Sequence, residues 1–172
     1  FAGASTAGDV RFGYALGEEA RRRMLGFWNI CAFFLTYARI DNPRAAQPAG
    51  ETPMDRWLAG RVCAFAARAE RAYGGYDTPA LIREFEACAD DISNWYVRAS
   101  RRRFWAAGMD RDKQCAYDTL YFAIRTLCRV MAPVIPFLAE HIWQTLVLPY
   151  GWGEESVHLS DFPAPAPPEA EL

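Results

Sequence analysis

Apolar residues recur at steps of three and four along most of this chain, and proline and glycine separate the runs that carry this spacing. Such a period places apolar side chains on one side of an α-helix, whereas a half-buried strand needs strict alternation. The spacing predicts helices over residues 18–39, 53–73, 78–105, 110–131 and 137–148. The sequence therefore predicts an all-α fold: an antiparallel bundle of four main helices, a proline-kinked fifth helix and a short C-terminal extended segment.

Short sequence signals mark the ends of the second helix. Thr52 is a capping residue, and Pro53 fits the first helical position. Gly74 and Gly75 are expected to end this helix by adopting the left-handed conformation. Two prolines that follow the fourth helix are expected to break it and to kink the chain before the fifth.

Length and composition fit one domain with its own core. The chain has 172 residues, of which 52% are apolar and 15% aromatic, and this excludes disorder for most of it. No uncharged apolar run reaches the roughly 18 residues that a membrane span needs. Five cysteines and two histidines lack metal-ligand spacing. We expect mostly buried, reduced thiols, no metal site and a soluble, cytoplasmic protein.

The overall charge argues against a protein that grips nucleic acid through its whole surface, because 19 basic residues oppose 21 acidic ones. Arginine is nevertheless concentrated at one place. Arg98, Arg101, Arg102 and Arg103 stand between aromatic pairs, with no acid from 92 to 109. Arginine forks beside aromatic surfaces are a means of holding RNA. The alternative is a solvated surface, since basic residues at a helix end also complement the helix dipole.

These four arginines take different positions around a helix. Relative to a core face centred on Ile92, Arg98 and Arg102 share a flank at roughly −100°. Arg101, at roughly 180°, extends the patch outward. Arg103 lies roughly 20° from the core line, and we expect it to be a structural ion-pair partner at the end of the bundle.

The first helix is apolar nearly all round. Its main stripe runs through Trp28 and Cys31, while Phe33 and Tyr37 point away from that stripe. A helix of this kind needs a second packing partner. Two partners are open: the C-terminal segment folding back, or a missing part of a larger protein.

Four segments, in this order, carry a resemblance to a known family: RRRMLGFWNICAFFLTYARID, ISNWYVRASRRRFW, MAPVIPFLAEHIW and ESVHLSDFP. Together they resemble the anticodon-binding domain of the isoleucyl-tRNA synthetase family, over residues 9 to about 163. The third segment would also suit the valyl and leucyl enzymes. WYVR followed by SRRRFW, together with SVHL, is typical of the isoleucyl enzymes.

The resemblance implies a piece of a class I ligase that activates isoleucine with ATP and Mg²⁺, carries zinc in its C-terminal region and esterifies isoleucine to tRNA. The family's H-x-G-H and K-M-S-K-S signatures are absent, so we expect the piece itself to be catalytically inert. Residues 1–16 would be a connector from the missing catalytic domain, 17–149 the anticodon-binding bundle, and 150–172 an extended segment with a proline-rich tail. The expected partners are the tRNA anticodon stem-loop and the missing catalytic and C-terminal domains, with no membrane.

The residue pattern and the family resemblance together predict which side chains contact RNA. Asn29 matches a position used for anticodon contact in the related methionyl enzyme, but Phe33 stands where that enzyme has an arginine one turn later, which leaves stacking or packing as its role. Arg22 shares the outward face of the same helix. Glu140 and Trp143 are expected to be structural. The predicted RNA-binding residues are Arg98, Arg102, Arg101, Trp95, Arg22, Asn29 and Phe33.

The sequence leaves two other functions open. One is the same domain of a valyl-tRNA synthetase. The other is a helical protein-interaction bundle that binds no RNA and docks a partner helix on the face of Phe33 and Tyr37. No carboxylate is paired with a histidine, a cysteine or a glycine-rich loop in a way that names a reaction of its own.

Overall fold

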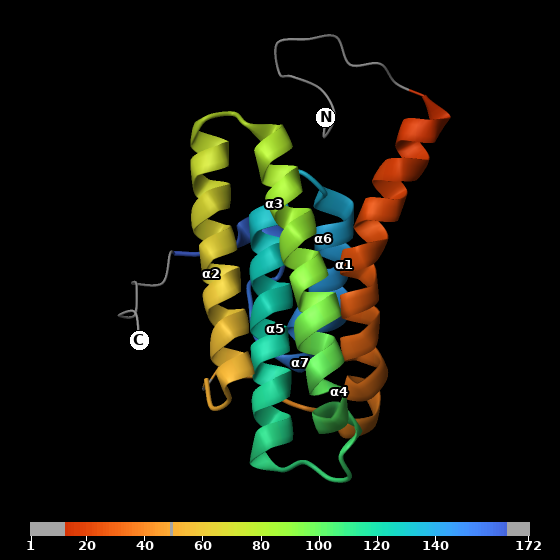
Figure 1. Ribbon diagram of the computed structural model, residues 1–172, viewed down its shortest axis with the longest axis vertical. Coiled ribbons are helices and arrows are strands. Elements are labelled where there is room, and N and C mark those ends of the chain that lie inside the picture. The colour runs from red at the N-terminus through yellow and green to blue at the C-terminus, as the bar shows by residue number, and fades with distance from the viewer. Residues whose placement is uncertain (1–12, 49, 165–172) are drawn as a thin grey trace.

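The structure is a computed structural model that describes residues 13–48 and 50–164. Residues 1–12 of the predicted connector and the tail 165–172 lie outside the described residues. The division into connector, bundle and tail therefore stays a prediction. Within the described residues the chain is helical and contains no strand, which confirms the all-α bundle (Figure 1).

Five helical rods account for most of the described chain, and two of them contain a π-helical stretch. The first two rods are α1 (Tyr14–Asp41) and α2 (Pro53–Gly74). The third runs without a break through α3 (Thr78–Asp91), η1 (Ile92–Val97) and α4 (Arg98–Trp105). The fourth is α5 (Arg111–Met131). The fifth joins α6 (Pro136–Ile142), η2 (Trp143–Val147) and α7 (Leu148–Tyr150), and a single turn, η3 (Val157–Leu159), follows it.

Ion pairs show the direction of the second and third rods. Arg68 of α2 pairs with Glu84 of α3 at 2.8 Å. At the other end of α2, Asp55 pairs with Arg103 of α4 at 2.7 Å. The two rods therefore run antiparallel, and α5 lies against α1, α2, α4 and α6 (Figure 1). Because most side chains of α5 are buried, this helix forms the centre of the core.

The end of α2 corrects one prediction. Gly75 has φ −94°, and the left-handed residue is Tyr76 with φ +54°. The amide of Asp77 donates to Ala72 O at 2.8 Å and that of Tyr76 to Tyr73 O at 3.1 Å. These two bonds form a Schellman motif that places the left-handed position at the residue after Gly75. The start of α2 is as predicted, because Thr52 accepts from the amide of Asp55 and completes a capping box.

Helix α1 also differs from its predicted stripe. It begins at Tyr14, and its buried residues are Phe27, Ile30, Cys31, Phe34 and Ala38, whereas Trp28 is 38% exposed. The buried stripe is therefore centred to one side of the predicted one. One of the two predicted packing partners, the C-terminal segment folding back, does contact α1, because Trp28 stacks on His141 and the ring of Phe34 lies 5.9 Å from that of Tyr150. The side of α1 that carries Phe33 and Tyr37 packs on the end of the third rod, which was not predicted.

The η1 stretch changes which side of the third rod faces the core. The periodicity predicts a buried Ala99, but Ala99 is exposed and the buried residues are Ser100 and Phe104. A π-helical turn takes up about one residue more than an α-turn, so it rotates the following helix by roughly the 100° of one residue. Arg98 and Arg102, predicted on a flank, are therefore turned further from the core.

Candidate nucleic-acid interface

Arg103 anchors the end of the third rod to α2. Its guanidinium binds the carboxylate of Asp55 through two hydrogen bonds of 2.7 and 2.9 Å, and Tyr96 Oη donates to the same carboxylate at 2.7 Å. Asp55 has no exposed surface. Burial raises the pKa of Asp55, but the hydrogen bonds from Arg103 and Tyr96 outweigh burial and hold this pKa below its ordinary value. The structural role predicted for Arg103 is confirmed.

This anchor sets the orientation of the three other arginines of α4. Arg98, Arg101 and Arg102 are exposed, and none forms an ion pair or a hydrogen bond with the described residues. Arg103, one residue further, is only 14% exposed in its side chain. A guanidinium that has no carboxylate partner keeps all five of its N–H donors for an incoming phosphate. We call Arg98, Arg101 and Arg102 the α4 arginines.

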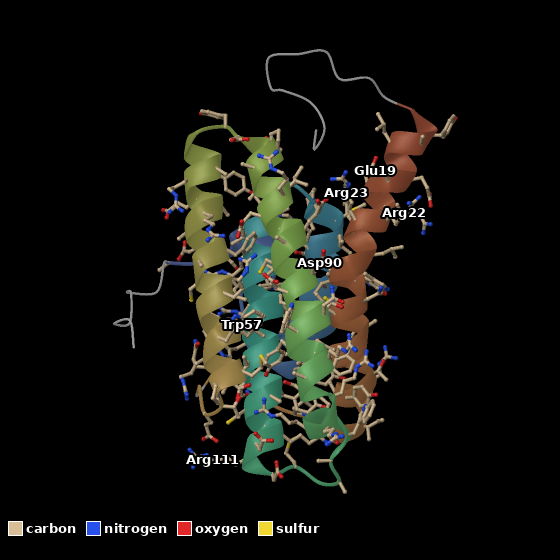
Figure 2. The ribbon with its side chains drawn as sticks, in the orientation of Figure 1. Glu19, Arg22, Arg23, Trp57, Asp90 and Arg111 are labelled. Atoms are coloured by element: carbon tan, nitrogen blue, oxygen red, sulfur yellow. The ribbon has the colours of Figure 1, made fainter. Side chains whose placement is uncertain are left out.

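An open groove of about 540 Å³ lies between α2 and the third rod. Pro53, Met54 and Trp57 line it from α2, and Asp91 and Trp95 line it from the other side. Figure 2 shows Trp57 on the half of α2 nearer its start. Trp57 is 40% exposed and Trp95 is 64% exposed. The groove thus has an apolar lining with two accessible indole rings.

A second aromatic group joins α1 to α4. The ring of Phe33 lies 5.1 Å from that of Phe104, and Trp105 Nε1 donates to Tyr37 Oη at 2.6 Å. These contacts make the end of the third rod the packing partner of the outward side of α1. They also cover part of the face on which the alternative function, a protein-interaction bundle, would dock a partner helix. Trp105 remains 58% exposed.

The structure does not bring all predicted site residues together. Trp95 and the α4 arginines share one helix end, and Asn29 is exposed on α1. Arg22 lies on the first half of α1 (Figure 2). Its neighbour Arg23 binds Glu86 of α3 at 2.9 Å, which precedes Arg98 by 12 residues or about 18 Å of helix. Arg22 therefore stands apart from the other candidates.

One exposed tryptophan that lines the groove was not predicted from the sequence. Trp57 lies in a helix whose apolar stripe was assigned without it, and a single outward aromatic in an amphipathic helix carries no signal of its own. Trp57 stands three residues after Met54, and both line the groove. The signal that could have found Trp57 was this pair on the same side of α2.

The comparison with known sequences adds to this geometry. The sequence profile of the anticodon-binding domain of tRNA ligases matches residues 55–172, which is more than half of the chain. The chain belongs to this family. No helix in the described part of this anticodon-binding domain is long and apolar enough to cross a bilayer.

Three relatives are similar over most of the domain. The isoleucine–tRNA ligase of Dehalococcoides mccartyi strain CBDB1 is 43% identical over 152 residues, which cover 86% of this chain and 15% of that protein. The enzyme of the same name from Thermus thermophilus is 40% identical over 169 residues, 95% of this chain and 16% of that protein. That from Streptomyces coelicolor is 40% identical over 168 residues, 94% and 16%. The chain thus spans about 15% of the length of these relatives.

The C-terminal part of the anticodon-binding domain is held to the bundle by residues predicted to be structural. Glu140 accepts hydrogen bonds from Ser156 Oγ at 2.9 Å and from the amide of Val157 at 3.0 Å. Trp143 Nε1 donates to Glu154 O at 2.7 Å. These contacts fix the segment after α7 without any β-sheet pairing in the described residues.

Proposed function

We propose that this chain is the anticodon-binding domain of an isoleucyl-tRNA synthetase, and that it holds the anticodon stem-loop of an isoleucine-accepting tRNA at the α4 end of the bundle. The α4 arginines are the observation that carries this proposal. They are exposed and without ion pairs in the described structure, and Trp95, three residues before Arg98, lines a groove with two accessible indole rings. The named relatives favour the isoleucyl enzyme over the valyl one.

The α4 arginines are suited to position RNA. Phosphate contacts supply affinity that is independent of sequence, and unpaired bases supply recognition. Because the chain carries a net charge of −2, attraction of RNA depends on this local patch and not on the overall charge. A patch of this size suits a domain that contributes one contact among several in a large enzyme.

The whole protein would ligate isoleucine to tRNA with ATP and Mg²⁺. We propose that this chemistry, and the zinc implied by the resemblance, belong to regions outside these 172 residues. The described residues contain no group of three His, Cys, Asp or Glu side chains that could hold a metal ion. On this proposal the domain binds RNA and takes no part in bond formation.

Fluorescence anisotropy with a labelled anticodon stem-loop tests the function. We expect the double variant Arg98→Gln plus Arg102→Gln to bind about tenfold or more weakly than the unsubstituted chain. The slope of log affinity against log salt should fall by about one for each lost phosphate contact. Arg83→Gln is the matched control, because Arg83 is exposed on α3 and has no ion pair in the described structure.

Two outcomes would contradict the proposal. Equal affinity of the double variant and of Arg83→Gln would remove the α4 arginines from the interface. Equal affinity for the isoleucine stem-loop and for a valine stem-loop would remove the isoleucine assignment.

A further inference from the structure

Lys113 is the only lysine of this chain, and the other 18 basic residues are arginine. It lies in the first turn of α5 and is 2% exposed. Among the described residues no arginine is buried to this degree. Because a buried cation is unfavourable unless partners compensate its charge, the partners of Lys113 indicate what this position does for the protein.

The ammonium group of Lys113 joins the ends of two other helices. Its Nζ lies 2.7 Å from Oδ2 of Asp41, the last residue of α1. The same Nζ donates at 2.8 Å to the carbonyl oxygen of Ala106, the residue that follows α4. Tyr117, about one turn further along α5, donates its hydroxyl to the same oxygen of Asp41 at 2.6 Å. We call Lys113, Asp41, Ala106 and Tyr117 the lysine clasp.

The geometry of the lysine clasp suits lysine better than arginine. An ammonium group is compact and directs three donors in different directions, whereas a guanidinium is a planar fork that fits one carboxylate through two parallel bonds. The two acceptors, on Asp41 and Ala106, belong to different segments of the chain. Because the side chain of Lys113 is only 3% exposed, a wider group has no open side to occupy.

The lysine clasp is the second polar attachment of the end of α4. Arg103 holds this end to α2 through the buried carboxylate of Asp55. The clasp holds the next turn from the side of α1, where Trp105 also donates to Tyr37. Figure 1 shows the ends of α1 and α4 and the start of α5 at the same end of the bundle. Attachments on two sides restrict the tilt of this helix end more than one attachment does.

The tilt of α4 determines where its exposed arginines point. Arg102 stands four residues before Ala106, and Arg98 stands four residues before Arg102, so each step is about one helical turn. Ordering a long side chain when a ligand binds opposes binding, and a fixed support reduces this cost. A helix end that is held in one orientation therefore presents the two guanidinium groups to phosphates with a smaller loss of entropy.

We propose that Lys113 is a positioning residue for the RNA interface. It touches no RNA, and by holding Asp41 and Ala106 together it fixes the direction in which Arg98 and Arg102 meet phosphates. This inference rests on the proposed function and adds to it a residue that acts from inside the bundle. The alternative is that the lysine clasp only stabilises the fold, which predicts unchanged RNA affinity in any variant that remains folded.

Fluorescence anisotropy with the labelled anticodon stem-loop tests the positioning role. Lys113→Met plus Asp41→Asn removes the clasp, leaves no buried charge unpaired and keeps the net charge at −2. At a temperature where thermal unfolding shows this clasp variant to be folded, we expect it to bind about 3- to 10-fold more weakly than the unsubstituted chain.

A milder pair of variants serves if the clasp variant does not fold. Tyr117→Phe removes one hydrogen bond of the lysine clasp and should weaken binding by about two- to threefold. Tyr121→Phe is the matched control, because Tyr121 is a buried tyrosine of the same helix whose hydroxyl bonds to Val147 O and Trp152. It should leave the affinity unchanged.

Two further measurements separate positioning from stability. In the background of Arg98→Gln plus Arg102→Gln, loss of the lysine clasp should weaken binding by less than about twofold, because the arginines through which it acts are absent. In the NMR spectrum of the nitrogen-15-labelled chain, the indole N–H signal of Trp105 should shift in the clasp variant and in Tyr117→Phe, and should stay in place in Tyr121→Phe.

The outcomes distinguish this inference from the proposed function. Suppose that the arginine double variant binds weakly. Unchanged affinity in the folded clasp variant and in Tyr117→Phe, the same fold loss in both backgrounds, or an unmoved Trp105 signal would then each overturn the positioning role, and the proposed function would stand. If the unsubstituted chain binds no stem-loop, the proposed function fails and this inference fails with it.

Discussion

At the scale of single residues, Asp55 joins the start of α2 to the end of the third rod. Its carboxylate is fully buried, caps α2 and binds Arg103 and Tyr96. Sequence signals predicted the capping position and the structural role of Arg103 separately. They could not join the two residues, because 48 positions separate them and only the packing of α2 against α4 brings them together.

Removal of the Asp55 carboxylate should destabilise the domain strongly. Asp55→Ala leaves the Arg103 guanidinium without its buried partner, which typically costs about 3–5 kcal/mol. For a chain of this size the midpoint of thermal unfolding should fall by about 6–20 °C. Asp112→Ala is the control, because Asp112 pairs with the same arginine but is 52% exposed, and its loss should cost less than about 1 kcal/mol. Equal losses in the two variants would contradict this role of Asp55.

The same carboxylate gives the stability a defined pH dependence. Since hydrogen bonds hold the pKa of folded Asp55 below its ordinary value, the ionised form stabilises the folded state. This contribution is complete above the unfolded pKa of about 3.9 and is lost as the pH falls through the folded pKa. Urea unfolding at a series of pH values should therefore show that Asp55→Asn loses less free energy of unfolding at low pH than the unsubstituted chain does. Equal losses in Asp55→Asn and in the unsubstituted chain would contradict this pH dependence.

At the scale of helices, apolar periodicity predicted every rod to within a few residues, because long amphipathic runs are the strongest local signal. The rotation of α4 was missed. A periodicity argument turns every residue by the same angle, whereas η1 contains wider turns. The missed rotation matters for the interface, since it turns Ala99 outward and directs Arg98 and Arg102 further from the core.

The left-handed residue after α2 offers a test at the same scale. Tyr76 has φ +54° and is 83% exposed, so glycine would relieve backbone strain without removing a packed side chain. We expect Tyr76→Gly to raise the free energy of unfolding by about 1 kcal/mol and the unfolding midpoint by about 2–4 °C. Asn42→Gly, at φ +46°, should gain less because asparagine tolerates this conformation. A destabilised Tyr76→Gly would contradict the assignment.

At the scale of the whole molecule, four sequence segments in order were sufficient for the family, and composition was not. The groove could not be predicted, because Trp57 and Trp95 lie 38 positions apart and line one groove only where α2 packs against the third rod. Arg22 was predicted to join the interface because it shares the outward face of its helix with Asn29 and Phe33. The fold places it on the first half of α1, away from the α4 arginines (Figure 2).

The proposed interface is tested most directly by a structure of this chain bound to the anticodon stem-loop of an isoleucine-accepting tRNA. We expect backbone phosphates within hydrogen-bond distance of Arg98 and Arg102. A stem-loop bound near Arg22, with the α4 arginines still facing solvent, would contradict the proposed interface.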